Sequence, residues 1–303
     1  MFPEKDIVEE AAIELGVDPS FVEKDWYALQ VLESISELVN GPHIAVFSGG
    51  TSLSKGYNLI KRFSEDLDFY VQADDPQQIA RNDLRAYRES LWVAIERIPG
   101  ISIKDGSRIS RNRSNFFSGQ LVYPQLFEPG IALRPELKVE FTFLNPDLTP
   151  ELRPLNTIIG QLSGDEPTTS MLCIRPEETG SDKFSALTWR ILVRDRNSVN
   201  DDPAMIRHAH DLYALQKVCA KDQDGFSLRV HKSFDQDKVR ANLPAFDKIG
   251  QAAEAALEIL KMDELYRKEY ASFVDSMFYG TESQRITFEM AIEAYEYLLG
   301  KLS

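Results

Sequence analysis

One stretch decides the fold: HIAVFSGGTSLSKGYNLIKRFSEDLDFYV, which runs from residue 43 to residue 71. Its first part, HIAVFS, and its last part, LDFYV, are short β-rich runs that predict two strands. Between them, TSLSKGYNLIKRF at residues 51–63 has the spacing of a helix. The stretch therefore predicts a unit of strand, glycine-rich turn, helix and strand.

The segments around this unit predict further elements. Residues 3–15 form an amphipathic helical pattern that Gly16 stops, and Ser20 with Glu23 three residues later forms a capping box for a second helix. Downstream, a long helix is predicted over residues 77–98, where a Pro–Gly pair follows. Strands are predicted at residues 101–104, 117–123 and 137–143.

The second half of the chain changes character. Five prolines between residues 146 and 176 predict a loop-rich crossing between domains. Helical patterns then recur at residues 181–193, 203–220, 246–262, 263–278 and 287–302. We therefore predict an α+β fold with N-terminal helices over residues 1–40, a core over residues 41–160, and a mainly helical domain over residues 161–303.

The composition excludes several classes of protein. The formal net charge of -14 argues against indiscriminate coating of nucleic acid, because phosphate binding needs Lys and Arg. Two distant cysteines provide no disulfide framework and favour a reducing compartment. No window approaches the ~18 consecutive apolar residues of a membrane span, and the acidic N-terminus lacks a secretory pattern. We expect a cytoplasmic protein without membrane contact.

Asp66 and Asp68 are the first candidate site residues. Strand alternation sends both to one face and Leu67 to the other. Neighbouring carboxylates repel each other, and a shared divalent cation offsets the repulsion. Mg²⁺ takes one or two carboxylates together with substrate phosphate oxygens. The pair suits nucleotidyl or phosphoryl transfer, although many acidic pairs at strand ends are merely solvated.

The glycine-rich turn at residues 48–52 is the second candidate. Its glycines let a ligand approach the backbone, and its hydroxyls add donors at the start of a helix. The turn alone is more simply structural, but its pairing with the two carboxylates indicates a nucleotide site. Cationic charge on the return to the carboxylates could neutralise phosphate. The candidate nucleotide-binding residues are Ser48, Gly49, Gly50, Thr51, Arg62 and Ser64.

Glu140 offers a third carboxylate. In the strand at residues 137–143, apolar side chains face one way, and Lys138, Glu140 and Thr142 face the other. Glu140 is a candidate third metal ligand or general base. Membership of the polar face of an amphipathic strand explains it equally well.

A basic segment is a local exception to the acidic charge. SIKDGSRISRNRSNFF, at residues 102–117, carries Lys104, Arg108, Arg111 and Arg113 and ends in two phenylalanines. Such a pattern is typical of an RNA-contacting loop. A solvated hairpin connection explains the same charges equally well.

Several motifs in order resemble the AbiEii/AbiGii-type toxin nucleotidyltransferases, a branch of the DNA polymerase β-like superfamily. GGTSLSKGYNLIKRFSEDLDF, at residues 49–69, resembles the signature of that family. FVEKDWYALQVLESI resembles its N-terminal helix, SDKFSALTWRILVRD its lysine-bearing helix, and IRHAHDLYAL its RDxxD-type helix. The resemblance spans residues 21–215.

The resemblance implies a polymerase β-like core with a mixed sheet, and a helical domain that completes the active-site cleft. It implies a metal-dependent nucleotidyltransferase with Mg²⁺ or Mn²⁺ on Asp66 and Asp68 and with NTP phosphates on the turn. Lys183 would contact the triphosphate, beside the essential acid Asp211. The implied acceptor is RNA, in particular the 3′ end of tRNA, with growth arrest as the outcome and an AbiEi-like winged-helix antitoxin as partner.

One position departs from the family pattern, because His208 follows Arg207 where an acid is expected. From the residues alone, Lys183 is expected in the first turn of a helix, where its charge opposes the helix dipole. An exposed lysine is an equally common reading. A zinc site on His208, His210 and Asp211 is disfavoured, because no further Cys or His lies at a ligand spacing.

Other functions stay open at this point. A nucleotidyltransferase of this kind could modify a protein or a small molecule instead of RNA. A non-catalytic binding module could keep the same fold, and the intact Asp66, Asp68, Lys183 and Asp211 argue against it. A carboxylate-metal nuclease is disfavoured, because hydrolysis does not require the glycine-rich turn.

Overall fold

Two compact units make up the chain in the computed structural model. The structure describes residues 3–38, 43–73, 81–111, 115–130, 133–241 and 246–302. The first unit consists of Met1–Asn58 and Phe63–Ile174. The second consists of Leu59–Arg62 and Arg175–Ser303.

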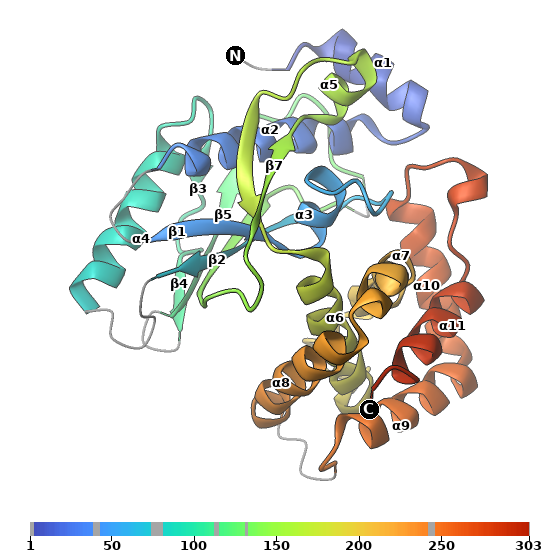
Figure 1. The fold of residues 1–303 in the computed structure, drawn as a ribbon. Coiled ribbons are helices and arrows are strands. Elements are labelled where there is room, and N and C mark those ends of the chain that lie inside the picture. Colours follow the sequence, from blue (N-terminus) through green and yellow to red (C-terminus); the bar gives the residue numbers. More distant parts are fainter. Residues whose placement is uncertain are drawn as a thin grey trace. The chain divides into compact units, whose positions relative to one another are not determined.

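A mixed sheet organises the first unit (Figure 1). Its strands are β1 (Ile44–Ser48), β2 (Asp66–Gln72), β3 (Ser102–Ile103), β4 (Ile109–Arg111), β5 (Phe116–Val122), β6 (Leu137–Phe143), β7 (Glu151–Leu155) and β8 (Thr169–Cys173). Within the described residues their order is β3-β5-β6-β2-β1-β8-β7, with β4 beside β5. β2 runs antiparallel to β1 and parallel to β6, while β1 runs parallel to β8.

One face of the sheet carries the hydrophobic core. Phe141 of β6 stacks on Phe69 and on Phe117, with ring centroids 4.9 and 4.7 Å apart. Helices α2 (Pro19–Ser36) and α4 (Arg81–Glu96) contribute further residues to this core. Because alternate strand residues point to opposite faces, the core fixes the polar residues of β2 and β6 on the other face.

The N-terminal helices form as predicted, with a change at one cap. α1 covers Lys5–Leu15. The N-cap of α2 is Asp18 and not Ser20, because the Asp18 carboxylate accepts a hydrogen bond from the Ser20 N–H at 2.9 Å. Glu23 does not cap the helix; its carboxylate accepts from the backbone N–H groups of residues 126 and 127. For α4, the predicted start at residue 77 lies outside the described residues.

The helix after the glycine-rich turn is shorter than predicted. α3 covers Gly49–Lys55 instead of residues 51–63. Gly56 follows it, and Asn58 adopts a left-handed φ of 51°. Such a residue cannot continue a right-handed helix. Leu59–Arg62 then belongs to the second unit.

The proline-rich region from 146 to 176 is more regular than the sequence suggested. It contains β7, helix α5 (Ile158–Ser163) and β8. Pro154 is tolerated in β7 because, among the described strands, β7 lies at the edge of the sheet, the position to which proline is largely confined. β8 pairs with β1, so the first unit extends to Ile174, whereas the sequence placed the boundary after residue 160.

Helices build the second unit (Figure 1). They are α6 (Pro176–Val193), α7 (Arg207–Lys221), α8 (Gln223–Ala241), α9 (Ile249–Met262), α10 (Glu264–Met277) and α11 (Phe288–Leu299), with short 3-10 turns at Pro203–Ile206 and Glu282–Gln284. Phe184 of α6 is fully buried and stacks on Tyr295 of α11 at 4.6 Å. Gly180 lets α6 approach α7, since a Cβ there would lie 2.3 Å from the Cys219 sulfur.

The predicted fold class is confirmed. The chain is α+β, with a mixed sheet followed by a mostly helical C-terminal part. Both cysteines are buried and form no disulfide. Among the helices that the structure describes, none has the length and apolar character needed to span a membrane.

Candidate active site

Polar side chains form a row across the sheet, on the face opposite the phenylalanine core. Asp68 of β2 lies opposite Ser48 of β1 and in register with Glu140 of β6. Asp66 lies two residues earlier on the same face, and both aspartates are half-buried. β2 thus presents two neighbouring carboxylates beside the end of β1, where the glycine-rich turn begins.

Gly49 brings the turn into direct contact with Asp68. It has a φ of +74°, and a Cβ at this position would lie 2.2 Å from Asp68 Oδ2. Only glycine satisfies both the left-handed backbone and the close approach. Gly50, the second glycine, is buried within α3. The glycine-rich turn and the carboxylate strand, which the sequence analysis paired, therefore lie in direct contact.

Thr51 fixes the turn to the carboxylate strand. Its Oγ1 donates to the backbone carbonyl oxygen of Asp66 at 2.6 Å. Ser48 and Thr51 are both buried. At the other end of α3, the ammonium of Lys55 pairs with the carboxylate of Asp25 at 2.6 Å. The turn is thus tied down at both ends.

We expect Gly49→Ala to lower the catalytic rate by about 100-fold, since a displacement of about 1 Å at reacting groups costs that much. The new methyl group must push the Asp68 carboxylate aside. Gly164→Ala is the matched control, because Gly164 has a φ of +72° and nothing lies within 4 Å of its added Cβ. Both variants carry about 1 kcal/mol of backbone strain. Equal rate losses in the two, measured beside thermal melts, would contradict the assigned contact.

Asp66 is held by residues that the sequence reading missed. The Nη2 of Arg134 donates to Asp66 Oδ1 at 2.8 Å, and its Nε donates to Glu65 Oε2 at 3.2 Å. Lys24 of α2 pairs with Glu65 at 3.0 Å. The available signal was the acidic run that begins at Glu65, since adjacent half-buried carboxylates require cationic partners. Ser64, a predicted phosphate contact, is half-buried just before this run.

The carboxylate pair fits a divalent cation that shares its ligands with a substrate. Within the described residues, no three His, Cys, Asp or Glu side chains form a group that could hold a metal. Glu140 pairs with Lys138 at 2.6 Å, so the structure does not bring the three carboxylates into one such group. Mg²⁺ commonly takes one or two carboxylates and completes its shell with phosphate oxygens and water. An ion held by Asp66 and Asp68 alone would therefore need phosphate oxygens and water to complete its shell.

Asp211 lies at the centre of a buried charge cluster in the second unit. Arg62 donates to it twice, from Nε to Oδ1 at 2.7 Å and from Nη2 to Oδ2 at 2.6 Å. Lys183 Nζ pairs with the same Oδ2 at 2.8 Å. The three side chains are almost fully buried. The cluster joins three predicted site residues that are far apart in the sequence.

Lys183 differs from its predicted placement. α6 begins at Pro176, so Lys183 lies well inside the helix and not in its first turn. The opposing effect of the helix dipole is confined to the ends of a helix and does not apply here. Its surroundings are set by Asp211 instead.

Two cations face one carboxylate in this cluster. Burial alone would raise the pKa of Asp211, but the charges of Arg62 and Lys183 hold it well below its ordinary value. Burial lowers the pKa of Lys183, and the Asp211 carboxylate opposes that shift. Asp211 is therefore ionised and faces the Arg62 guanidinium and the Lys183 amine.

His208 and His210 flank the cluster as neutral side chains. Burial, together with the charges of Lys183 and Arg207, holds the pKa of His208 well below its ordinary value of 6.5. Burial also lowers the pKa of His210. Below pH 6.5 the unfolded chain therefore binds protons at these histidines that the folded chain does not bind.

The free energy of unfolding should consequently fall as the pH drops below 6.5. The folded pKa of His208 is depressed, so the contribution is lost on acidification, at up to about 1.4 kcal/mol per pH unit for one histidine. His208→Gln should flatten this dependence between pH 6.5 and about 5. Denaturant unfolding at a series of pH values measures the slope, and an unchanged slope in the variant would refute the assignment.

Two of the four basic residues predicted to contact RNA pair with nearby acids. Lys104 pairs with Glu136 at 2.6 Å, and Arg108 pairs with Glu96 at 2.7 Å. Arg111 is exposed in β4. The fourth predicted residue, Arg113, lies outside the described residues. Phe117, at the end of the segment, is fully buried in the core.

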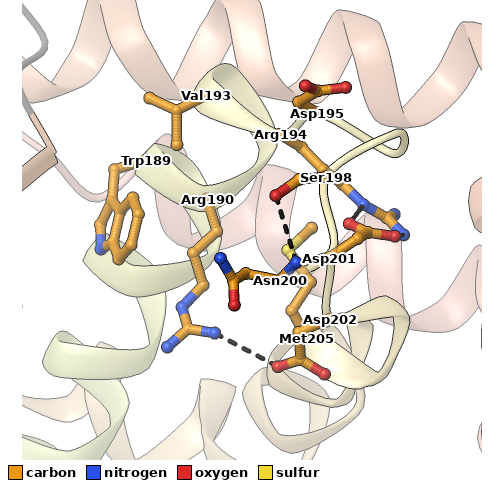
Figure 2. A pocket seen from close by; sticks show the side chains of 10 residues that line it. All are labelled: Trp189, Arg190, Val193, Arg194, Asp195, Ser198, Asn200, Asp201, Asp202 and Met205. Carbon is orange, nitrogen blue, oxygen red and sulfur yellow. Dashed lines mark hydrogen bonds and ion pairs between the residues drawn. The ribbon is translucent and has the colours of Figure 1, made fainter.

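A pocket of about 230 Å³ lies in the second unit, between the end of α6 and the loop that follows it. Figure 2 shows Arg190 reaching Asp202 across it and Arg194 bound to Asp201. Arg194 also pairs with Glu269 at 2.6 Å. None of the predicted site residues lines this pocket, and its arginines are engaged by carboxylates.

Comparisons with known proteins agree with the motifs. A family model described as nucleotidyl transferase AbiEii toxin, type IV TA system, matches residues 30–295. Among solved structures, MenT4, a nucleotidyltransferase toxin from Mycobacterium tuberculosis H37Rv, is similar with a TM-score of 0.50 and 18% identity, over 99% of this chain and 99% of that one. At that identity the likeness shows the fold alone. No curated protein matches significantly.

Proposed function

The chain belongs to the AbiEii family of nucleotidyltransferase toxins of type IV toxin–antitoxin systems, and we propose that it transfers a nucleoside monophosphate from an NTP to an RNA acceptor. The acceptor hydroxyl gives up its proton to water and its oxygen bonds to the α-phosphorus, while the bond from that phosphorus to the β-phosphate oxygen breaks and pyrophosphate leaves. The observation that carries this proposal is the contact of the Asp68 carboxylate with Gly49, which joins a carboxylate pair to a glycine-rich turn.

In the first unit, Asp66 and Asp68 would hold a divalent cation, Mg²⁺ or Mn²⁺. When bound, such an ion neutralises phosphate charge and lowers the pKa of the attacking hydroxyl. The turn from Ser48 to Thr51 supplies small residues and hydroxyls for the NTP phosphates, and Ser64, two residues before Asp66, adds a further hydroxyl. Glu140 pairs with Lys138, and we propose no catalytic role for it.

In the second unit, Lys183 is the proposed contact for the triphosphate. Its ammonium shares Asp211 Oδ2 with Arg62, so the carboxylate fixes the position of both cations. A preorganised cation in a water-poor site stabilises developing negative charge without a reorganisation cost. Arg62 was predicted as a direct phosphate contact. Its two hydrogen bonds to Asp211 favour a positioning role.

The finer features of the proposal go beyond the family description and rest on the resemblance of the motifs. A toxin of a type IV system acts beside an antitoxin, and we propose an AbiEi-like winged-helix protein in that role. We propose tRNA, at its 3′ end, as the acceptor, with growth arrest as the consequence and the cytoplasm as the site of action. Within the basic segment at residues 102–117, we propose Arg111, exposed in β4, for an RNA contact.

Acceptor class is tested by where label appears. The chain is incubated with each α-labelled NTP and Mg²⁺, together with total tRNA in one arm and a protein extract in another. Label in the tRNA band that is removed by 3′ trimming supports the proposal. Label in protein would favour the rival protein-modifying transferase, and no transfer in either arm would favour a non-catalytic binding module.

A further inference from the structure

The backbone of Arg134 is held in place by hydrogen bonds, whereas its guanidinium group is half-exposed. Its backbone N–H donates to Glu65 Oε1 at 2.6 Å, and its carbonyl oxygen accepts from Lys24 Nζ at 2.7 Å. The side chains of Glu65 and Lys24 are only 13% and 6% exposed, so both anchors are firm. The Arg134 side chain is 48% exposed. The main chain is thus clamped, while the half-exposed guanidinium, bonded through Nε to Glu65 Oε2 at 3.2 Å, can turn its Nη2 away from Asp66.

The guanidinium occupies an oxygen that the proposed metal needs. Its Nη2 lies 2.8 Å from Asp66 Oδ1. A divalent ion on the same carboxylate would place like charges within a few ångström of each other, and such charges repel strongly when half-buried. Arg134 and a metal ion therefore compete for Asp66.

Nucleotide phosphate offers the displaced guanidinium a new partner. Arginine presents a planar fork of donors that suits phosphate as well as carboxylate. We propose that Arg134 is an exchange residue: it holds Asp66 while the site is empty and passes to a phosphate of the nucleotide once the metal–nucleotide complex arrives. This inference rests on the proposed function. The exchange predicts that Arg134 weakens the binding of a metal ion alone and strengthens the binding of the metal–nucleotide complex.

Arg134→Gln tests the exchange directly. In the absence of nucleotide, the variant should bind Mn²⁺ up to about fivefold more tightly, since that is the most an exposed ion pair contributes. It should bind the Mn²⁺ complex of an α,β-methylene NTP about tenfold more weakly, because a charge-assisted hydrogen bond to phosphate is lost. Electron paramagnetic resonance of free Mn²⁺ gives the affinity for the metal alone. Calorimetry with the α,β-methylene analogues of the four NTPs gives the affinity for the metal–nucleotide complex.

Three further variants make the outcome decisive. Arg134→Lys keeps the charge and should lie between wild type and Arg134→Gln in both affinities. Arg88→Gln, an arginine paired with Glu89 in the same unit, should change neither. Asp66→Asn should weaken Mn²⁺ binding, which tests the proposed metal site independently of Arg134.

A purely structural role for Arg134 would move both affinities of Arg134→Gln in the same direction, or would lower its melting temperature and leave neither affinity changed. Either result overturns the exchange while the metal site stands. If wild type and Asp66→Asn bound Mn²⁺ equally, the proposed metal site would fail and the exchange with it.

Discussion

Asp68→Asn is expected to lower the rate of nucleotidyl transfer by at least about 1,000-fold, because metal-assisted charge stabilisation is worth several kcal/mol of the barrier. Asparagine has nearly the same shape, so the contact with Gly49 can persist. It lacks the negative charge that a divalent cation requires. The measurement is the single-turnover rate with labelled NTP, beside a thermal melt that shows an intact fold.

The control for this variant is Glu96→Gln. Glu96 is an exposed carboxylate of the first unit that pairs with Arg108. Its neutralisation removes the same charge from the same unit but away from the turn, so the transfer rate should stay within about twofold, as for most surface changes. A comparable loss in both variants would mean that net charge, and not the Asp68 site, controls the rate.

Asp211→Ala is expected to destabilise the second unit by about 3–5 kcal/mol, because removal of one partner leaves buried charge uncompensated. Arg62 and Lys183, both almost fully buried, would lose the carboxylate with which they pair. Urea unfolding followed by circular dichroism measures the loss. Asp202→Ala is the control, since Asp202 is 43% exposed and its pair with Arg190 is long at 3.4 Å.

A double variant separates charge from packing in this cluster. Lys183→Met in the Asp211→Asn background removes a stranded cation, so its destabilisation should be smaller than the sum of the two single changes. Strict additivity, or a loss below about 1 kcal/mol for Asp211→Ala, would contradict a cluster held together by charge.

Part of the fold could be predicted because the local signals agree with the tertiary structure. The β6 stretch at residues 137–143 alternates strictly, and the structure buries its apolar side against Phe69 and Phe117. Gly16 ends the first helix, as the sequence indicated, and the structure shows it in the left-handed conformation. For the β6 stretch and for Gly16, the local sequence pattern alone indicates the conformation that the structure shows.

Other elements were missed because long-range pairing decides them. β7 contains Pro154, which argues against a strand until its place at the sheet edge is known. α8 buries Phe226, Val230 and Phe234 at a spacing of four, a narrow stripe that its surrounding polar residues conceal. These elements owe their conformation to partners distant in sequence.

In the candidate site, too, the local features could be predicted from the sequence and the long-range contacts could not. The glycine turn and Asp66–Asp68 lie within one short stretch, so their spacing was readable. The approach of Asp68 to Gly49 depends on the β1–β2 register, and the grip of Arg134 on Asp66 joins residues far apart in the chain. Local sequence patterns do not predict such contacts, because the contacts depend on how the strands pair in the sheet.

The most direct test of the central claim follows the α- and γ-phosphates separately. The chain is incubated with total tRNA, Mg²⁺ and each NTP labelled at the α- or the γ-phosphate, with Asp68→Asn in parallel. Nucleotidyl transfer predicts that α-label enters the tRNA, that γ-label appears in pyrophosphate, and that Asp68→Asn abolishes both. Label from the γ-phosphate on the acceptor, or transfer that survives in Asp68→Asn, would contradict the account.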